Sequence, residues 1–126
     1  MASQVSGTPV AFLYVAERAR ALGFYRDVLG LELRREDAFG DFLAMGGALV
    51  RMTVLPDHKP NPHPVLGWNV ADIAASVDAL RAQGVEFLVY DGMGQDDRGV
   101  WTSPDGATKV AFFTDPDGNV LSLSQG

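Results

Sequence analysis

The apolar residues of this chain change their spacing twice between Val10 and Leu31. From Val10 they alternate with other residues, as in a half-buried strand. Gly30 suits the left-handed conformation that ends many helices, and alternation resumes at Leu31. Between these segments, five apolar residues recur at three- and four-residue intervals and share one helix face: Ala21, Leu22, Tyr25, Val28 and Leu29. The pattern predicts a strand, a helix and a second strand.

A similar succession starts again at Val65. The second predicted helix has Asp72 as its N-cap and Gly84 at its end. Residues 15–17 (Val-Ala-Glu) correspond to residues 70–72 (Val-Ala-Asp), so the chain carries an internal duplication. The buried stripe of the second helix is predicted to be Ile73, Val77 and Leu80.

Three further strands are predicted after each helix, which makes each half a βαβββ module and the fold class α+β. We expect a single domain over residues 1–126, with module one at about 8–55 and module two at about 65–124. The segment between them, 56–64, contains four prolines and is predicted to be an extended linker. The additional strands are expected at 31–35, 39–45 and 48–55 in the first half, and at 85–91, either 99–103 or 109–114, and 120–124 in the second.

Charge and composition narrow the possible partners. The formal net charge is −6 and the basic residues are scattered, which disfavours nucleic acid as a partner. The apolar runs are too short to span a bilayer and the first residues have no signal-peptide pattern. We therefore expect no membrane association and a cytoplasmic location. Because the chain has no cysteine, disulfides and thiolate metal sites are excluded.

Three segments resemble the vicinal oxygen chelate superfamily: "FYRDVLGLEL" from Phe24, "VADIAASVDALRAQGVEF" from Val70 and "FFTDPDGNVLSL" from Phe112. This superfamily contains glyoxalase I, the extradiol dioxygenases, and the fosfomycin- and bleomycin-resistance proteins. The resemblance covers about residues 8–124. It implies that tandem βαβββ modules form a cup-shaped mixed sheet, with helices on the outer face and a small molecule inside the cup. The fold alone does not select one function, because it hosts many chemistries.

The resemblance also indicates where metal-dependent members hold their ion. Their ligands lie on the first and last strands of each module, and the matching positions here are Val10, Arg51, Val65 and Ser122. None of these offers the imidazole or carboxylate that such an ion needs, and a shift of one residue along each strand supplies none either. We therefore expect a metal-independent protein with no cofactor.

Arg51 is the leading candidate for ligand binding. It lies in the middle of a mostly apolar predicted strand, and alternation puts it on one face with Leu49 and Thr53. By the resemblance, that face looks into the cup, where a guanidinium could hold a carboxylate, phosphate or enolate-like oxygen. The alternative is that Arg51 pairs with a nearby Asp or Glu, or reaches the rim of the cup.

Five further residues complete the predicted ligand-binding set. Phe12 and Tyr14 share the face of Val10, although a tyrosine packed in the core is an alternative for Tyr14. Trp101 is expected to form a wall of the pocket, whereas Trp68 points toward the helices. Polar groups facing inward are expected from Asn69 and Ser122.

Three other features have weaker functional interpretations. His58 and His63 lie near Asp57 in the proline-rich segment, but no third metal ligand is nearby, so we expect solvated histidines. The stretches "SPDGATK" and "DPDGN" lack the complete ligand spacing of calcium loops and are predicted to be turns. The acidic loop 91–97 is predicted to form a mobile lid or rim, with a role that the sequence does not define.

Three functions remain. The favoured one is a homodimeric, metal-free protein that binds a small planar or anionic molecule and sequesters a drug or metabolite, as in the bleomycin-resistance branch. The alternative is a metal-independent enzyme of lyase or isomerase type, in which Arg51 stabilises an oxyanion and Tyr14 or an Asp moves a proton. A third is a noncatalytic domain that keeps only a dimer interface, its cup filled by Phe12, Val10 and Val65.

Overall fold

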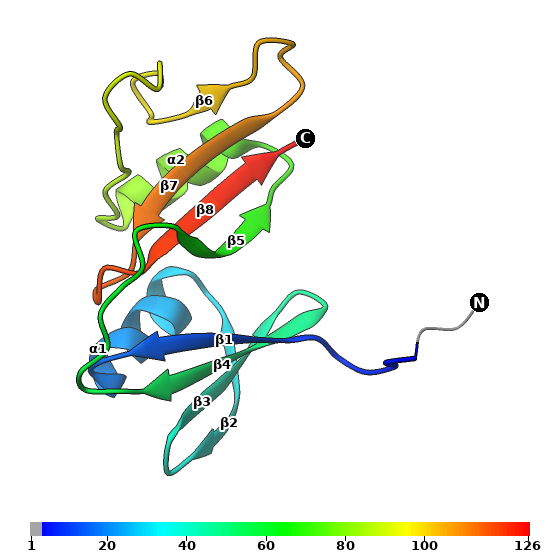
Figure 1. The fold of residues 1–126 in the computed structure, drawn as a ribbon, viewed down its shortest axis with the longest axis vertical. Coiled ribbons are helices and arrows are strands. Elements are labelled where there is room, and N and C mark those ends of the chain that lie inside the picture. Colours follow the sequence, from blue (N-terminus) through cyan, green and yellow to red (C-terminus); the bar gives the residue numbers. More distant parts are fainter. Residues whose placement is uncertain (1–3) are drawn as a thin grey trace. The chain divides into compact units, whose positions relative to one another are not determined.

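The structure is a computed structural model that describes residues 4–126, and its parts are drawn in Figure 1. Residues 1–3, which the predicted domain includes, lie outside the described residues. The chain divides into two compact units between His58 and Lys59, within the proline-rich segment. No helix in the described range is long and apolar enough to cross a membrane. The fold class is α+β, as predicted, with two four-stranded mixed sheets and helices.

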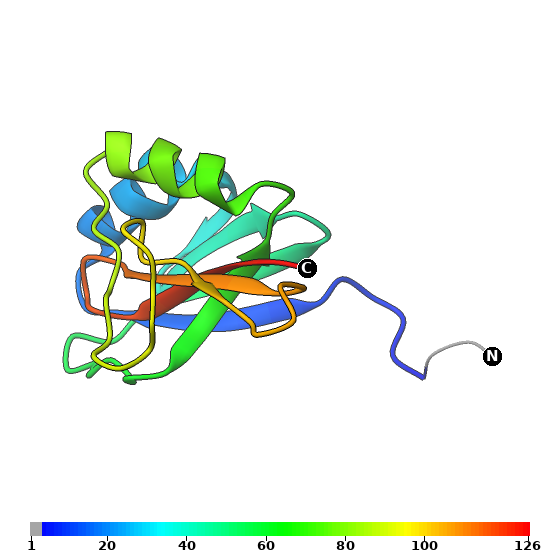
Figure 2. The ribbon, with the colours of Figure 1, turned by 90° about the horizontal axis from the view of Figure 1, so that it is seen from above.

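The first unit is a βαβββ module, as predicted. In its sheet the strand order is β1-β4-β3-β2, where β1 and β4 are parallel and the other neighbours are antiparallel. The helical segment covers one face of the sheet (Figure 2). The elements are β1 (Val10–Val15), α1 (Arg18–Leu22), the π-helical segment η1 (Gly23–Val28), β2 (Glu32–Asp37), β3 (Gly40–Met45) and β4 (Ala48–Val54).

The helical segment begins and ends through local interactions. The carboxylate of Glu17 accepts hydrogen bonds from the backbone N–H groups of Ala19 and Arg20, which caps α1. Tyr25 is fully buried on the face toward the sheet, in agreement with the predicted apolar stripe. Gly30 has a φ of 79°, which confirms the predicted left-handed residue after the helix.

The second unit repeats this arrangement with the strand order β5-β8-β7-β6. Asp72 caps α2, as predicted, by accepting a hydrogen bond from the N–H of Ala75 at 3.1 Å. Gly84 follows the helix with a φ of 90°, which also confirms its predicted role. The elements are β5 (Pro64–Asn69), α2 (Ile73–Ala82), β6 (Trp101–Thr102), β7 (Lys109–Thr114) and β8 (Val120–Gln125).

The strand predicted over residues 85–91 is wrong. This segment forms only an isolated bridge between Phe87 and Phe113 and a hydrogen bond from the Leu88 N–H to the Phe112 carbonyl. The side chain of Gln95 bonds to backbone groups that would otherwise be free to pair with a neighbouring strand. It accepts from the Tyr90 N–H at 2.7 Å and donates to the carbonyls of Leu88 and Gly99 at 3.0 and 2.8 Å. Because one amide satisfies these backbone groups, the segment stays extended without a ladder.

The linker also ends earlier than predicted, because Pro64 already begins β5. Proline is tolerated at the first residue of a strand, where its missing N–H breaks no ladder hydrogen bond. Of the two alternatives 99–103 and 109–114, the structure contains strands in both, with β6 much shorter than the first of them.

Strands β1 and β4 of the first unit each have one buried and one accessible face. Leu13 and Val15 of β1 are buried, whereas Phe12 is 66% exposed and Tyr14 is 40% exposed. On β4, Val50 and Met52 are buried; the alternate residues Leu49, Arg51 and Thr53 are half-buried. The predicted alternation is therefore confirmed, and Arg51 shares the face of Phe12.

Candidate functional site

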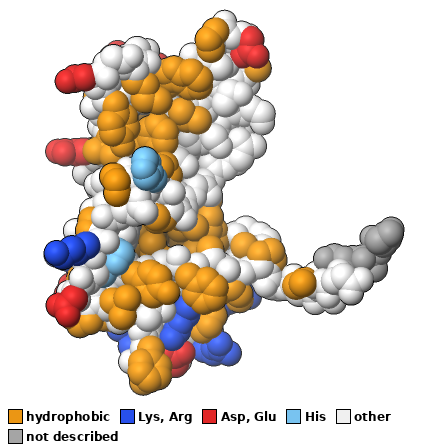
Figure 3. Space-filling view, viewed as in Figure 1, with side chains coloured by type: hydrophobic (Ala, Val, Ile, Leu, Met, Phe, Trp, Pro, Cys, Tyr) orange, Lys and Arg blue, Asp and Glu red, His pale blue; other side chains and the backbone are white. Residues whose placement is uncertain are grey.

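A single cross-strand row on the accessible face of the first sheet alternates aromatic and basic residues. Phe12 of β1 pairs with Arg51 of β4, and Arg51 pairs in turn with Phe42 of β3. Phe42 then pairs with Arg35 of β2. Because directly paired residues point to the same face, these side chains form one line across the four strands. Figure 3 shows hydrophobic and basic side chains gathered on the side of this unit that faces the viewer.

Phe42 lies between two guanidinium groups. The Cζ atom of Arg35 is 4.3 Å from the centroid of the Phe42 ring, and that of Arg51 is 4.8 Å from it. Arg35 and Arg51 come from the strands on either side of β3, so the two cations reach the ring from opposite flanks. Both contacts have cation–π geometry, which fixes the positions of the two charges relative to the ring.

Arg51 has one carboxylate partner and one buried nitrogen without a partner. Its Nη2 donates a hydrogen bond to Asp37 Oδ1 at 2.9 Å. Its Nη1 is shielded from solvent and has no acceptor among the described residues. The side chain as a whole is only 13% exposed. A buried donor without an acceptor costs about 1–3 kcal/mol, and a ligand oxygen that reached Nη1 would remove this cost.

Asp37 connects the row to the β2–β3 turn. Its Oδ1 also accepts hydrogen bonds from the N–H groups of Phe39 at 2.8 Å and Gly40 at 3.1 Å. The hydrogen bond from Arg51, followed by that from Phe39, lowers the pKa of Asp37 below its ordinary value. Pairing with a nearby Asp or Glu is part of the alternative that the sequence leaves open beside ligand binding by Arg51. The structure shows this pair on the face that Arg51 shares with Phe12.

A β-bulge beside this row creates a hollow. Leu33 pairs with Leu43 and Arg35 pairs with Phe42, so Arg34 is an extra residue without a partner in β3. The hollow has a volume of about 200 Å³ and is lined by Arg34, Arg35, Phe42 and Leu49. Arg35 and Phe42 are absent from the predicted set, although both lie in predicted strands. The available signal is the pair of adjacent arginines in an otherwise alternating strand.

Tyr14 lies in the row next to that of Phe12, where it pairs with Thr53 of β4. Its ring centroid is 6.1 Å from that of His58, with the planes tilted by 38°. Tyr14 therefore lies on the accessible sheet face with Phe12, and His58 is its aromatic neighbour. Contact of Phe12, Tyr14 or Arg51 with a ligand stays a prediction.

The second sheet has its own row of predicted residues. Asn69 pairs with Ser124, Ser124 with Val110, and Val110 with Trp101, so Asn69 and Trp101 lie at the two ends of one row. The Ser124 hydroxyl and the Asn69 side-chain oxygen are 3.3 Å apart, in a hydrogen bond that Ser124 donates. Ser122, two residues before Ser124, shares the same face. Their ligand contacts also stay predictions.

Ser122 lies against the backbone of Gly67, with which it is paired. A Cβ atom at residue 67 would overlap the Ser122 hydroxyl, so glycine provides the space that this hydroxyl occupies. Trp68, the next residue of β5, pairs with buried Leu123 and so lies on the opposite face of the sheet, as predicted.

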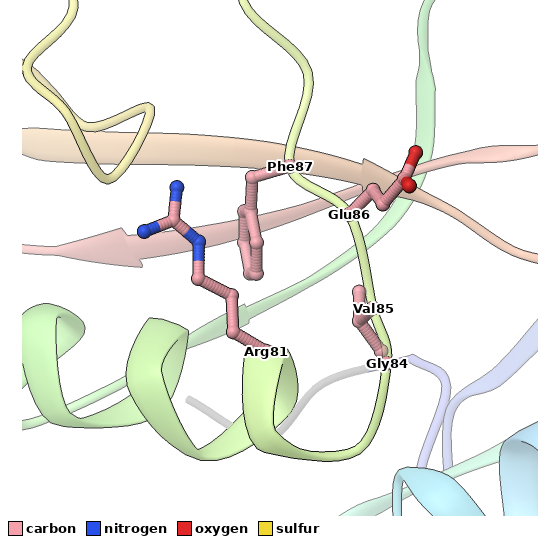
Figure 4. A pocket seen from close by; sticks show the side chains of 5 residues that line it. All are labelled: Arg81, Gly84, Val85, Glu86 and Phe87. Atoms are coloured by element: carbon pink, nitrogen blue, oxygen red, sulfur yellow. The ribbon is translucent and has the colours of Figure 1, made fainter.

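Another hollow lies at the end of α2, away from these rows. It has a volume of about 510 Å³ (Figure 4) and contains none of the residues predicted to bind a ligand. Arg81, on its wall, donates a hydrogen bond to the carbonyl of Asp97 at 2.9 Å. The lining residues are Arg81, Gly84, Val85, Glu86 and Phe87.

Metal-ligating side chains do not converge in the part of the chain that the structure describes. No group of three or more His, Cys, Asp or Glu residues there could hold a metal ion. His58 belongs to the first unit and His63 to the second. The positions that correspond to metal ligands carry Val10, Arg51, Val65 and Ser122, of which Arg51 is a cation.

The two βαβββ units define a protein of the tandem βαβββ-module class. Residues 8–123 match the Glyoxalase/Bleomycin resistance protein/Dioxygenase superfamily, and the chain belongs to this family. No curated protein matches the chain in sequence.

Solved structures agree with this fold. The chain is similar to FosX, a genomically encoded fosfomycin resistance protein from Listeria monocytogenes, with a TM-score of 0.74 and 14% identity over 98% of this chain and 95% of that chain. A glyoxalase/bleomycin resistance protein/dioxygenase from Alicyclobacillus acidocaldarius gives a TM-score of 0.71 and 17% identity, covering 94% and 90%. TnmS3, an antibiotic binding protein from Streptomyces sp. CB03234, gives 0.69 and 22%, covering 98% of each chain. At these identities the likeness concerns the fold.

Proposed function

We propose that the protein binds a small planar or anionic molecule on the accessible face of the first sheet, without a metal ion. The observation that carries the proposal is the position of Arg51 beside Phe42, with a buried Nη1 that has no acceptor among the described residues. A carboxylate, phosphate or enolate-like oxygen would satisfy this nitrogen. Phe12 and Tyr14 supply exposed aromatic surface on the same face, suited to a flat molecule.

Metal-independent binding is supported by the residues at the four positions that hold ions in metal-dependent relatives. Two of them, Val10 and Val65, have no lone pair, and Arg51 would repel a cation. Ser122 alone offers a weak neutral oxygen, which is insufficient for a divalent ion. In this proposal the fixed charge of Arg51 takes the place of the ion.

The lowered pKa of Asp37 favours binding over catalysis. A general base works best when its pKa lies near the working pH, whereas the hydrogen bond from Arg51 lowers the pKa of Asp37. We therefore place the lyase- or isomerase-type enzyme second.

We propose sequestration of a drug or metabolite as the biological role, in a cytoplasmic homodimer. The supporting comparisons are those with a fosfomycin resistance protein and an antibiotic binding protein of the same fold. In the second unit, Asn69, Trp101 and Ser122 would provide further ligand contacts.

The test is a calorimetric titration of the protein with a panel of planar acids and antibiotics, repeated with Arg51→Met. We expect at least one compound to bind, with an affinity about tenfold or more weaker for Arg51→Met, because a charged hydrogen bond is lost. Arg26→Met is the control, since Arg26 pairs with its exposed neighbour Asp27. Equal affinities for both variants would contradict the proposal. Stoichiometric metal in protein purified without chelator would contradict its metal-free part.

A further inference from the structure

We infer that the hollow beside the β-bulge is a subsite for the acidic group of a single-ring aromatic carboxylate, with Arg35 as the residue that binds this group. The inference rests on the proposed function and adds the chemical class of the ligand and the place of its charge. It concerns a part of the face that the predicted set of ligand residues does not include.

Of the three arginines beside Phe42 and the hollow, Arg34, Arg35 and Arg51, Arg35 is the one whose side chain has no acidic partner in the described part of the chain. Arg51 pairs with Asp37 at 2.9 Å, and Arg34 pairs with Glu32 at 3.1 Å. The Arg35 side chain forms no ion pair or hydrogen bond with any residue in the described range 4–126. Its guanidinium contacts the Phe42 ring. Its N–H donors are therefore available to a ligand, in the planar geometry that matches a carboxylate.

The bulge explains why two consecutive arginines line one hollow. In a regular strand, neighbouring side chains point to opposite faces. Arg34 is the additional residue of the bulge, so both Arg34 and Arg35 lie beside Phe42. Because Arg34 is paired with Glu32, Arg35 is the cation of this hollow that is left to stabilise a negative charge. The local charge contrasts with the net charge of −6 of the chain.

The size and walls of the hollow indicate a single ring. Its volume of about 200 Å³ exceeds the roughly 150 Å³ in which benzene fits, and leaves room for little more than one acidic group. Leu49 and Phe42 provide the apolar wall. Ala44 pairs with Leu49 and Glu32 in the adjacent row, and its short side chain leaves space there.

The test uses benzoate as the probe, with benzamide as its uncharged analogue. Titrations of ¹⁵N-labelled protein are followed by the NMR signals of backbone amides and arginine Nε–H groups. We expect benzoate to shift the signals of Arg35 and its β2–β3 neighbours and to bind about tenfold or more tightly than benzamide. Arg35→Gln should weaken benzoate binding about tenfold, and Arg26→Gln, with the same change in charge, should not. Ala44→Leu should also weaken binding, by filling the hollow.

Other outcomes would contradict this inference, the proposed function, or both. Equal affinity for benzoate and benzamide, an unchanged affinity in Arg35→Gln, or the absence of benzoate binding would overturn the subsite. If planar acids bind and lose affinity in Arg51→Met but not in Arg35→Gln, the proposed function stands and this inference fails. If no member of the panel binds and Arg51→Met changes nothing, both fail. Preserved amide spectra of the variants show that each is folded.

Discussion

Asp37 Oδ1 accepts a hydrogen bond from Arg51 Nη2 at 2.9 Å, although the same oxygen already accepts two from the β2–β3 turn. One carboxylate oxygen thus both shapes the turn and holds the central arginine of the face. The pair lies at the accessible surface of the first sheet, where a ligand anion would compete with Asp37 for Arg51. The charge of Asp37 can be removed without removing the oxygen that shapes the turn.

We predict that Asp37→Asn increases the affinity for anionic ligands by a few fold. Asparagine keeps an oxygen for the turn, but it no longer neutralises Arg51. Calorimetry with a bound planar acid measures the change. The effect should vanish in an Arg51→Met background, and a gain that persists there would show that Asp37 acts through overall charge.

The same variant should change the pH dependence of stability. Arg51 lowers the pKa of Asp37, so the folded state binds a proton at this site less readily than the unfolded state, whose pKa is about 3.9. The stabilisation from the carboxylate is therefore present above that value and is lost as the pH falls through the folded pKa. Urea denaturation should show Asp37→Asn to be less stable than wild type near pH 7 and similar at strongly acidic pH. A constant difference across this range would contradict the pairing.

Arg18 and Asp41 form a second ion pair, on the buried face of the first sheet. Arg18 Nε and Nη2 donate to the two carboxylate oxygens at 3.2 and 2.8 Å, and Nη2 also donates to the Gly40 carbonyl at 2.9 Å. Asp41 is fully buried, whereas the Arg18 side chain is 34% exposed. The sequence gives no sign of this pair, because alternation places Asp41 at a position expected to be apolar.

We predict that Arg18→Met destabilises the protein more than Asp41→Asn does. Removing Arg18 leaves a buried carboxylate without its counter-ion, whereas Arg18 can reach solvent when Asp41 is neutralised. Chemical denaturation compares the two variants, with Arg26→Met as the control for an exposed pair. The control should change the free energy of unfolding several-fold less than Arg18→Met. The opposite order of the first two variants would show that the buried carboxylate is not the dominant cost.

The hydrogen bonds of Gln95 lead to a prediction for the loop 91–97. Its amide bonds to the backbone of Leu88, Tyr90 and Gly99. Gln95→Glu keeps an acceptor for Tyr90 but replaces both donors by a charged oxygen facing two carbonyls. We expect it to destabilise this segment by about 1–3 kcal/mol, from the loss of hydrogen bonds that satisfy part-buried groups. Hydrogen exchange should then be faster at Leu88 and Tyr90 than in wild type, with exchange in the first unit unchanged. Unchanged exchange would show that the Gln95 side chain does not hold this segment in place, as expected if the loop is the predicted mobile lid or rim.

The sequence predicts the repeat and the two faces of its strands because these depend on local periodicity. Phe12 and Tyr14 alternate with Leu13 and Val15 whatever strand lies beside them. The bulge at Arg34 depends instead on how β2 aligns with β3, which no local pattern specifies. The contact of Arg35 with Phe42 follows from that alignment, so the sequence singled out Arg51 and Phe12 but missed Arg35 and Phe42.

Residues 85–91 show the opposite case, in which a local pattern predicts a strand that does not form. Their apolar pattern is that of a strand, but a ladder also needs a partner with unpaired backbone groups. Here the Gln95 side chain bonds to the Leu88 carbonyl and the Tyr90 N–H of the segment itself, so these groups do not pair with another strand. The distinction depends on a side-chain contact several residues away, and alternation carries no information about it.

The close packing of Gly67 against Ser122 in the second sheet can be tested by making one substitution in two backgrounds. Alanine at residue 67 would overlap the Ser122 hydroxyl, so Gly67→Ala should force Ser122 from its rotamer and destabilise the protein by about 1 kcal/mol. In a Ser122→Ala background the overlap with the hydroxyl is absent and the 3.1 Å contact with the backbone oxygen of residue 122 remains, so the same substitution should cost clearly less than in wild type. Urea denaturation of the four proteins gives the coupling energy directly. The control is Gly23→Ala, whose Cβ meets nothing within 4 Å, and which should behave alike in both backgrounds. Equal costs of Gly67→Ala with and without the hydroxyl would show that Ser122 does not lie over Gly67, and would remove the basis for placing its hydroxyl on the ligand face.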